Sequence, residues 1–199
     1  MDRSRIEAFS DGVFAFAFTL LIVDFHAPES TADLRTYLPS LWPQLLASCI
    51  SFLLIGLIWA NHRAMFLHIR NIDRMTMFLN VLLMADVAFL PFPTSVLAKA
   101  IGEKQGLTEA AFLYGLVLTI GGIFFNALWL YAGAHLELAG KEAAKRHWRG
   151  IAIRFGVGPP AYLLSTLCAL WSPWLSIALY IALIIYFWMP GRSEQRIEA

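Results

Sequence analysis

Long apolar segments recur along the chain and constrain its fold more than any other feature. A helix that crosses a bilayer needs about 20 mostly apolar residues. Of the 199 residues, 59% are hydrophobic and only 15% are charged. Six stretches fit such helices, at residues 5–25, 42–66, 75–98, 108–134, 148–170 and 173–189. We therefore predict an all-α, multi-pass integral membrane protein with six transmembrane helices in one domain, residues 1–199.

Basic residues are distributed unevenly between the two sides of this predicted bundle. One side carries twelve: Arg3, Arg5, Arg63, Arg70, Arg74, Lys141, Lys145, Arg146, Arg149, Arg154, Arg192 and Arg196. The other side carries three, which are Arg35, Lys99 and Lys104. Because cytoplasmic loops are enriched in Lys and Arg, we predict a cell-membrane protein with both termini in the cytoplasm. The longest outer loop is then residues 27–41. The net charge of +1 gives no indication of a nucleic-acid partner.

The first apolar segment has polar residues at its start and two different faces. At 100° per residue, Phe16, Leu20 and Val23 form one stripe, with Thr19 beside it. Asp11 lies about 140° away from Phe16 on the same helix, so it requires water or a partner on another helix. Two alternatives are simpler: Ser10 and Asp11 could cap a helix that begins at Gly12, and the stripe could be ordinary packing or lipid-facing surface.

A partner for Asp11 is available at the inner end of the second segment. The sequence Trp59-Ala60-Asn61-His62-Arg63 ends on the same side of the membrane as Asp11. His62 can donate or accept a hydrogen bond, and its charge responds to pH. We therefore predict a polar network between the first two helices.

Other polar residues fall within the later apolar segments. Asp86 lies near the middle of the third, where an ionised carboxylate is costly. Asn80 and Asn126 are expected to form hydrogen bonds between helices. The sequence of residues 90–94, Leu-Pro-Phe-Pro-Thr, predicts a break in helix geometry near the end of the third span.

The sequence contains no constellation typical of an enzyme. It has no phosphate-binding loop, no Ser nucleophile elbow and no His/Glu metalloprotease motif, so neither catalysis nor a cofactor is expected. A Thr-Val-Gly-Tyr-Gly filter is also missing, as is a helix with regularly spaced Arg residues.

Three motifs together resemble the family of transmembrane protein 175, the endolysosomal potassium channel, and its shorter prokaryotic homologues. The first is Arg5, Phe9, Ser10 and Asp11 at the start of the first helix. The second is Trp59, Asn61, His62 and Phe66, followed by Asp73 and Arg74. The third is residues 90–94. The resemblance is clear over the first half of the chain, and beyond that it rests on hydropathy.

The resemblance implies a homotetramer with six helices per subunit, in which the first helices line a central pore without a re-entrant selectivity-filter loop. Phe16, Leu20 and Val23 would form a hydrophobic constriction, and Thr19 would present its hydroxyl to the permeating ion. The motif residues, namely Arg5, Phe9, Ser10, Asp11, Trp59, Asn61 and His62, would form the structural network that fixes the pore helix. The family pattern has Leu or Ile at the innermost position, whereas this chain has Phe16. Apart from the resemblance, Asp24 at the outer end of the first segment is expected to be a solvated interface residue, and it would also concentrate cations if it rimmed the outer mouth of a pore.

A potassium-selective channel is therefore the leading functional hypothesis, with K⁺ as the permeating ion and no cofactor or other metal. The main alternative is a secondary or proton-coupled transporter that titrates Asp86, Asp11 and His62. A scaffold without flux is a third. Transporters often contain inverted repeats, and the Arg-x-x-x-Phe-Ser-Asp motif has no counterpart in the second half of the chain.

Overall fold

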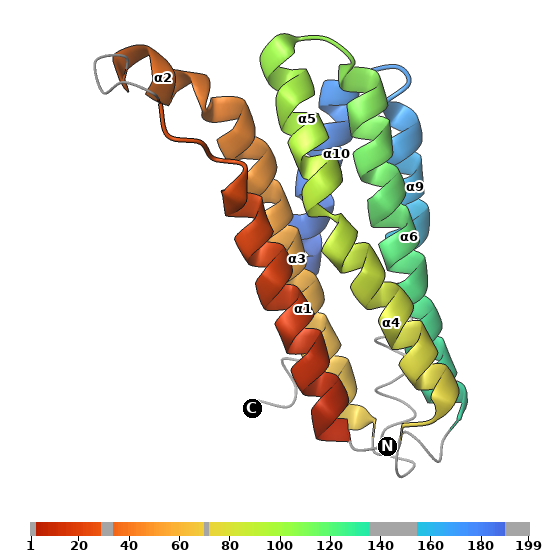
Figure 1. Ribbon diagram of the computed structural model, residues 1–199. Coiled ribbons are helices and arrows are strands. Elements are labelled where there is room, and N and C mark those ends of the chain that lie inside the picture. The colour runs from red at the N-terminus through yellow and green to blue at the C-terminus, as the bar shows by residue number, and fades with distance from the viewer. Residues whose placement is uncertain (1–2, 29–33, 70–71, 136–154, 190–199) are drawn as a thin grey trace.

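The computed structural model describes residues 3–28, 34–69, 72–135 and 155–189, and in these ranges all regular structure is helical (Figure 1). The helices are α1 (Arg3–Val23), α2 (Leu34–Ser40), α3 (Trp42–His68), α4 (Arg74–Phe89), α5 (Pro91–Glu103), α6 (Leu107–Ala134), α9 (Gly158–Cys168) and α10 (Pro173–Trp188). Four segments are long and apolar enough to cross a membrane: Arg3–Val23, Trp42–Leu67, Arg74–Glu103 and Leu107–Ala134. The chain is thus an all-helical membrane protein. The fifth predicted span begins at Trp148, outside the described residues.

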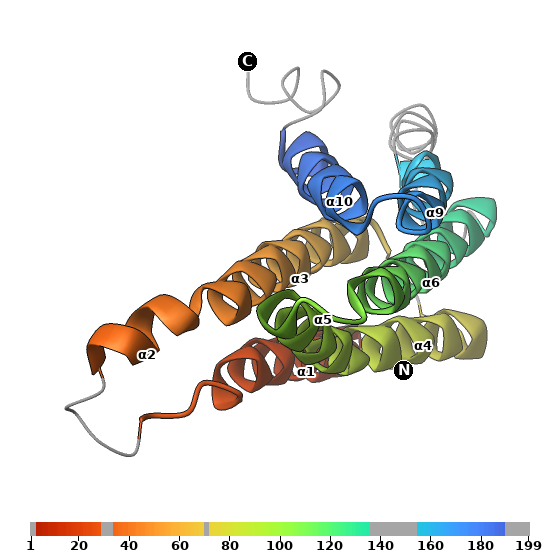
Figure 2. The same ribbon diagram turned by 90° about the horizontal axis from the view of Figure 1, so that it is seen from above.

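The long helices run roughly along one axis and form an elongated bundle (Figures 1 and 2). Helix α1 packs against α3 and α4, and α6 packs against α4, α5 and α9. Helix α10 completes the bundle by contacting α3, α6 and α9. One consequence is that α1 lies at the edge of the bundle, with a face that no other described helix covers (Figure 2).

The predicted break in the third apolar segment is present at residues 90–94, because α4 ends at Phe89 and α5 begins at Pro91. A helix resumes at Pro91 and continues to Glu103. Proline is tolerated in the first turn of a helix, where the missing N–H has no intrahelical acceptor to lose. The resulting break separates α4, which packs on α1 and α6, from α5, which packs mainly on α3 and α6.

The predicted outer loop also contains a helix. Residues 34–40 of the 27–41 segment form α2, with Pro39 inside it. Its residues are exposed or half-buried, so it adds little to the core. Sequence patterning did not indicate it, because seven residues are too few to show a helical period.

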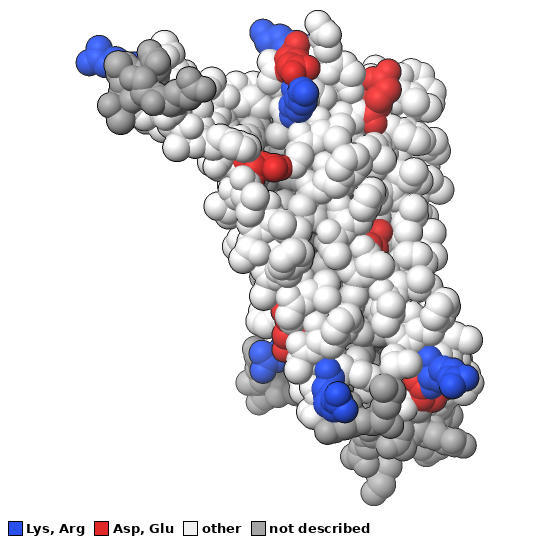
Figure 3. Space-filling view, viewed as in Figure 1, with Lys and Arg blue, Asp and Glu red and all other residues white. Residues whose placement is uncertain are grey.

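Charged side chains gather at the two ends of the bundle, with a broad band between them that contains few charges (Figure 3). Arg3 begins α1 and Arg74 begins α4 at one end, whereas Lys99 lies in the last turns of α5 at the other. This separation fits a membrane-spanning body. Eight of the twelve basic residues assigned to the inner side lie outside the described residues: Arg70, Lys141, Lys145, Arg146, Arg149, Arg154, Arg192 and Arg196.

Asp73 caps the N-terminus of α4 and connects it to α6. Its carboxylate accepts a hydrogen bond from the Thr76 amide at 2.7 Å and another from the Tyr131 hydroxyl. Burial alone would raise the pKa of Asp73, but these hydrogen bonds outweigh it, and the pKa lies below its ordinary value. The capping bond therefore stabilises the fold at neutral pH, and this contribution is lost as the pH falls through the lowered pKa.

We expect Asp73→Ala to lower the free energy of unfolding by about 1 kcal/mol, the usual cost of losing an N-cap. Thermal unfolding of the purified protein, followed at several pH values, measures it. The difference between variant and wild type should shrink in acid. A difference that is constant down to the lowest pH would contradict the capping role.

Candidate pore helix and its polar network

Helix α1 has one buried face and one exposed face. The buried residues recur at three- and four-residue intervals and are Ile6, Ser10, Phe14, Ala17 and Leu21. On the opposite side, the side chains of Phe16 and Val23 are 59% and 66% exposed. Thr19 is exposed and Leu20 is half-buried. The stripe identified in the sequence therefore faces away from the core of the bundle.

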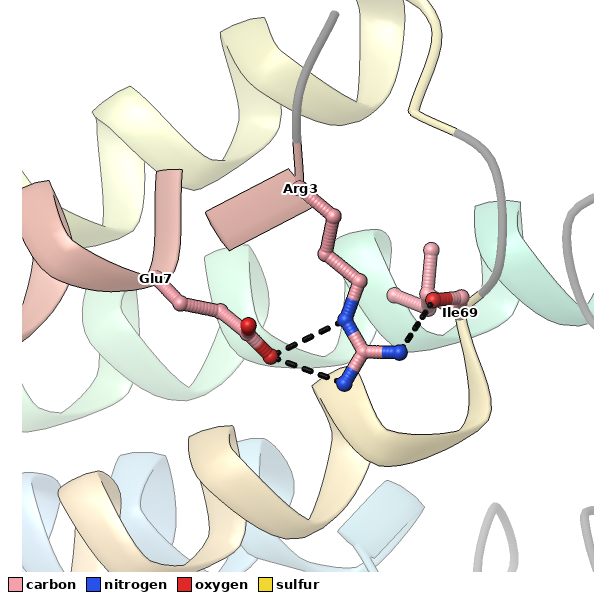
Figure 4. A network of polar contacts seen from close by, with 3 residues as sticks. All are labelled: Arg3, Glu7 and Ile69. Carbon is pink, nitrogen blue, oxygen red and sulfur yellow. Dashed lines mark hydrogen bonds and ion pairs between the residues drawn. The ribbon is translucent and has the colours of Figure 1, made fainter. Parts of the chain in front are cut away.

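The alternative in which Ser10 and Asp11 cap a helix at Gly12 is wrong, because α1 already begins at Arg3. At the start of the helix, Arg3 forms polar contacts within α1 and with the end of α3. Its guanidinium donates to Glu7 Oε1 at 2.9 and 3.0 Å and to the carbonyl oxygen of Ile69 at 3.2 Å (Figure 4). Ile69 follows directly after α3, so this contact joins the lower ends of α1 and α3.

Arg3 was missing from the predicted site, which named Arg5 instead. The Arg5 side chain is exposed. The Arg3–Glu7 spacing of four residues is typical of ion pairs on helices and could have identified the pair. The contact with Ile69 could not be found this way, because it depends on how α1 and α3 pack.

A buried chain of hydrogen bonds crosses from α1 to α3 through α4. The Asn80 side-chain amide donates to Ser10 Oγ at 3.1 Å, and Asn80 Oδ1 lies 2.7 Å from His62 Nε2. Ser10, Asn80 and His62 are each at most 3% exposed. Since Asn80 Oδ1 can only accept, His62 Nε2 donates and therefore carries a hydrogen. The His62 ring is also enclosed by Phe66 at 4.4 Å and Phe14 at 5.6 Å between ring centroids.

Asp11 finds its partner on α3, outside this buried chain. The Trp59 indole N–H donates to Asp11 Oδ1 at 2.9 Å. Asp11 is exposed, as is Phe9, whose side chain is 53% exposed. The motif residues thus separate into a buried chain through Ser10 and His62 and an exposed bond through Asp11 and Trp59. Asn61 belongs to neither and lines an internal cavity instead.

Two further residues predicted from the sequence have defined contacts. The Thr19 hydroxyl donates to the Phe16 carbonyl oxygen at 2.8 Å, which uses its hydrogen and leaves the lone pairs of its oxygen free to face a cation. Asp24, just beyond the end of α1, accepts a hydrogen bond from Ser95 on α5. Asp86 forms no hydrogen bond with Asp11 or His62 and faces the cavity that Asn61 lines. Among the described residues, no cluster of three or more His, Cys, Asp or Glu could hold a metal ion.

Comparisons with known proteins agree with these motifs. Residues 5–91 match the family model described as the endosomal/lysosomal potassium channel TMEM175. The chain is 37% identical over 188 residues to the potassium channel B446_29190 of Streptomyces collinus, covering 94% of this chain and 91% of that protein. It is equally identical over 190 residues to the potassium channel Cha6605_3372 of Chamaesiphon minutus, covering 94% and 93%.

A solved structure has the same fold. The crystal structure of a lysosomal potassium-selective channel TMEM175 homolog from Chamaesiphon minutus superimposes with a TM-score of 0.82 at 34% identity, covering 93% of this chain and 95% of that one. The human endosomal/lysosomal proton channel TMEM175 is 31% identical over 145 residues, which is 29% of its length. With a bacterial relative matched over nearly its whole length, this chain belongs to the TMEM175 family of channels.

Proposed function

We propose that the chain forms a potassium-selective channel, in which four copies surround a pore lined by α1. The exposed stripe of α1 carries this proposal. In a chain whose bacterial relatives are named potassium channels, Phe16 and Val23 lie 59% and 66% exposed on the helix at the edge of the subunit. Four such edges brought together would enclose the stripe.

The constriction in this proposal is a set of apolar rings, with Phe16 nearest the cytoplasm and Leu20 and Val23 above it. An apolar ring offers an ion nothing in place of its water shell, and a narrow ring excludes water and blocks conduction. Thr19 lies between these rings with its oxygen available as an acceptor, because its hydrogen is bound to the Phe16 carbonyl. Potassium would thus meet oxygen atoms at one level of the pore.

The experiment that tests the proposal is direct recording from purified protein in planar bilayers. With potassium on one side and sodium on the other, a channel of this kind gives a reversal potential displaced towards the potassium equilibrium potential. The absence of current, in protein shown to be assembled, would favour the scaffold hypothesis and overturn the proposal.

A transporter or proton pathway is tested in the same preparation. Because the human relative is named a proton channel, liposomes that contain a pH dye should be followed together with the potassium diffusion potential. Among the described residues, no direct hydrogen bond links Asp86, Asp11 and His62 to one another. We therefore expect potassium flux without an obligatory pH change, and strict coupling of the two would support the transporter.

Removal of the Thr19 oxygen should weaken conduction without disturbing assembly. Thr19→Val keeps the shape of the side chain but removes a ligand worth about 1 kcal/mol to a passing cation, which corresponds to a roughly fivefold lower potassium conductance. Thr19→Ser keeps the oxygen and is the matched control. Single-channel recordings measure both, and equal conductance in Thr19→Val and wild type would show that Thr19 does not contact the ion.

The proposed orientation can be tested by cysteine labelling in intact cells. The natural thiols Cys49 and Cys168 are free, so both are first replaced by Ala. Ser40→Cys, at the end of α2, should react with an impermeant maleimide from outside. Ala134→Cys, at the end of α6, should react only after the membrane is opened. The reverse pattern would show that both termini are outside and that Asp24 faces the cytoplasm.

A further inference from the structure

A cavity lies inside the subunit, away from the exposed face of α1. It holds about 70 Å³ of space accessible to water-sized molecules between α3, α4, α6, α9 and α10. Most of its walls are apolar, and Leu54, Leu118, Phe125 and Phe187 are among them. Mostly apolar walls with a few polar groups are typical of sites for small organic molecules, and a cavity of this volume admits only a small one.

Asp86 provides the carboxylate in this wall, and it is 9% exposed. Among the residues that the structure describes, none donates a hydrogen bond to its carboxylate or forms an ion pair with it. The carboxylate reaches across to α6 at Gly121, where an added Cβ would lie 2.2 Å from Asp86 Oδ2. Helix α6 therefore leaves room for a carboxylate that has no partner within the described protein.

The other polar groups of the cavity also favour a ligand that donates hydrogen bonds. The Asn126 amide nitrogen already donates to the carbonyl oxygens of Gly122 and Phe155, at 2.8 and 3.0 Å. What Asn126 can still offer is its own carbonyl oxygen, which is an acceptor. Asn61 can turn its amide oxygen to the cavity in the same way. A carboxylate and two amide oxygens complement a cation with N–H groups.

Aromatic rings form part of the remaining wall. Phe155 lies 5.1 Å from Phe125 and 6.3 Å from Phe187, and Tyr162 lies 6.4 Å from Phe187, between ring centroids. Aromatic faces attract organic cations as well as apolar groups. A bare alkali ion is a poorer fit, because it needs a full shell of oxygen atoms in place of its water, and the cavity offers only a few.

We propose that this cavity binds a small amphipathic ammonium ion, whose charged head pairs with Asp86 and whose apolar body packs against Leu54, Leu118 and the aromatic wall. This site is separate from the α1 stripe, and the inference goes beyond ion conduction. The test measures binding rather than current, so its outcome for the cavity does not depend on the proposed channel activity.

The experiment compares n-hexylamine, which is protonated at neutral pH, with 1-hexanol, which has the same apolar body without the charge. Each is added to the purified full-length protein in detergent, and the thermal unfolding midpoint is measured. At about a hundredfold excess over its dissociation constant, hexylamine should raise the midpoint of the wild type by about 5 °C. Hexanol should have little effect, and Asp86→Asn should remove the response to hexylamine.

A pair of variants keeps the test decisive if Asp86→Asn does not fold. Leu118→Phe places extra volume in the cavity while Asp86 remains, and it should abolish the response. Leu116→Phe makes the same change two residues away, at a side chain that is 39% exposed on the outside of α6, and it should respond like the wild type. Equal stabilisation by amine and alcohol, or an unchanged response in Asp86→Asn or Leu118→Phe, would overturn the proposal.

Discussion

Replacement of Phe16 by asparagine is expected to raise the potassium current roughly tenfold, which requires a barrier lower by only about 1.4 kcal/mol. Four phenyl rings at the narrowest level of the proposed pore would exclude water, and a polar side chain of smaller volume would hydrate that level. Discrimination against sodium should fall at the same time, because a wider, wetter ring lets both ions keep more of their water. Single-channel conductance and the reversal potential between potassium and sodium measure the two effects.

Ile22→Asn is the matched control for this experiment. Ile22 is as exposed as Phe16, at 59%, but it lies about 120° away around α1. The same polar substitution there should leave conductance and reversal potential unchanged. If Phe16→Asn behaves like Ile22→Asn in protein of unchanged assembly size, the stripe is packing or lipid-facing surface and the constriction lies elsewhere.

The largest loss of stability is expected from Asn80→Ala. It removes the hydrogen-bond partners of Ser10 and His62 together, and both are almost completely buried. An unpaired buried group costs about 1–3 kcal/mol, although alternative partners in the membrane-inserted unfolded state reduce this, and single interhelical bonds average about 0.6 kcal/mol. We expect a total of about 2 kcal/mol, measured by unfolding in mixed micelles.

Asp11→Ala provides the contrast, because it removes an exposed bond and leaves only the indole N–H of the half-buried Trp59 without that partner. Its cost should be well below that of Asn80→Ala. A double-mutant cycle between His62→Ala and Asn80→Ala should give a coupling energy of about 0.6–1.7 kcal/mol. If Asp11→Ala is the more damaging of the two single variants, the buried chain is not what holds α1 in place.

The two faces of α1 could be predicted from the sequence because helical periodicity depends only on the local geometry of the chain. The same reasoning indicated that Asp11 needs a partner on another helix, and the segment that contains Trp59 was the candidate. It did not indicate that His62 would bind Asn80 instead of Asp11. That choice depends on the rotation of α3 and α4 about their axes, which the packing of the whole bundle determines.

The break at Pro91 shows a different limit of sequence reasoning. Two prolines within residues 91–93 signal interrupted helix geometry, and α4 does end at Phe89. Whether a new helix continues in nearly the same direction depends on tertiary contacts, and here α5 is held by α3 and α6. Similarly, the sequence shows that Asp86 is a carboxylate within an apolar segment. It does not show the cavity that Asp86 faces, because helices far apart in the sequence form that cavity.

The polar contacts of α1 also bear on the order in which the helices pack together during synthesis. A ribosome releases α1 first, but Trp59, which binds Asp11, follows 48 residues later, and Asn80, which binds Ser10, follows 70 residues later. The unbroken apolar run of this helix, residues 12–23, is also short for a membrane span. During synthesis α1 therefore lacks these hydrogen bonds until α3 and α4 have entered the bilayer. Its docking against them is a late step in the folding of the nascent chain.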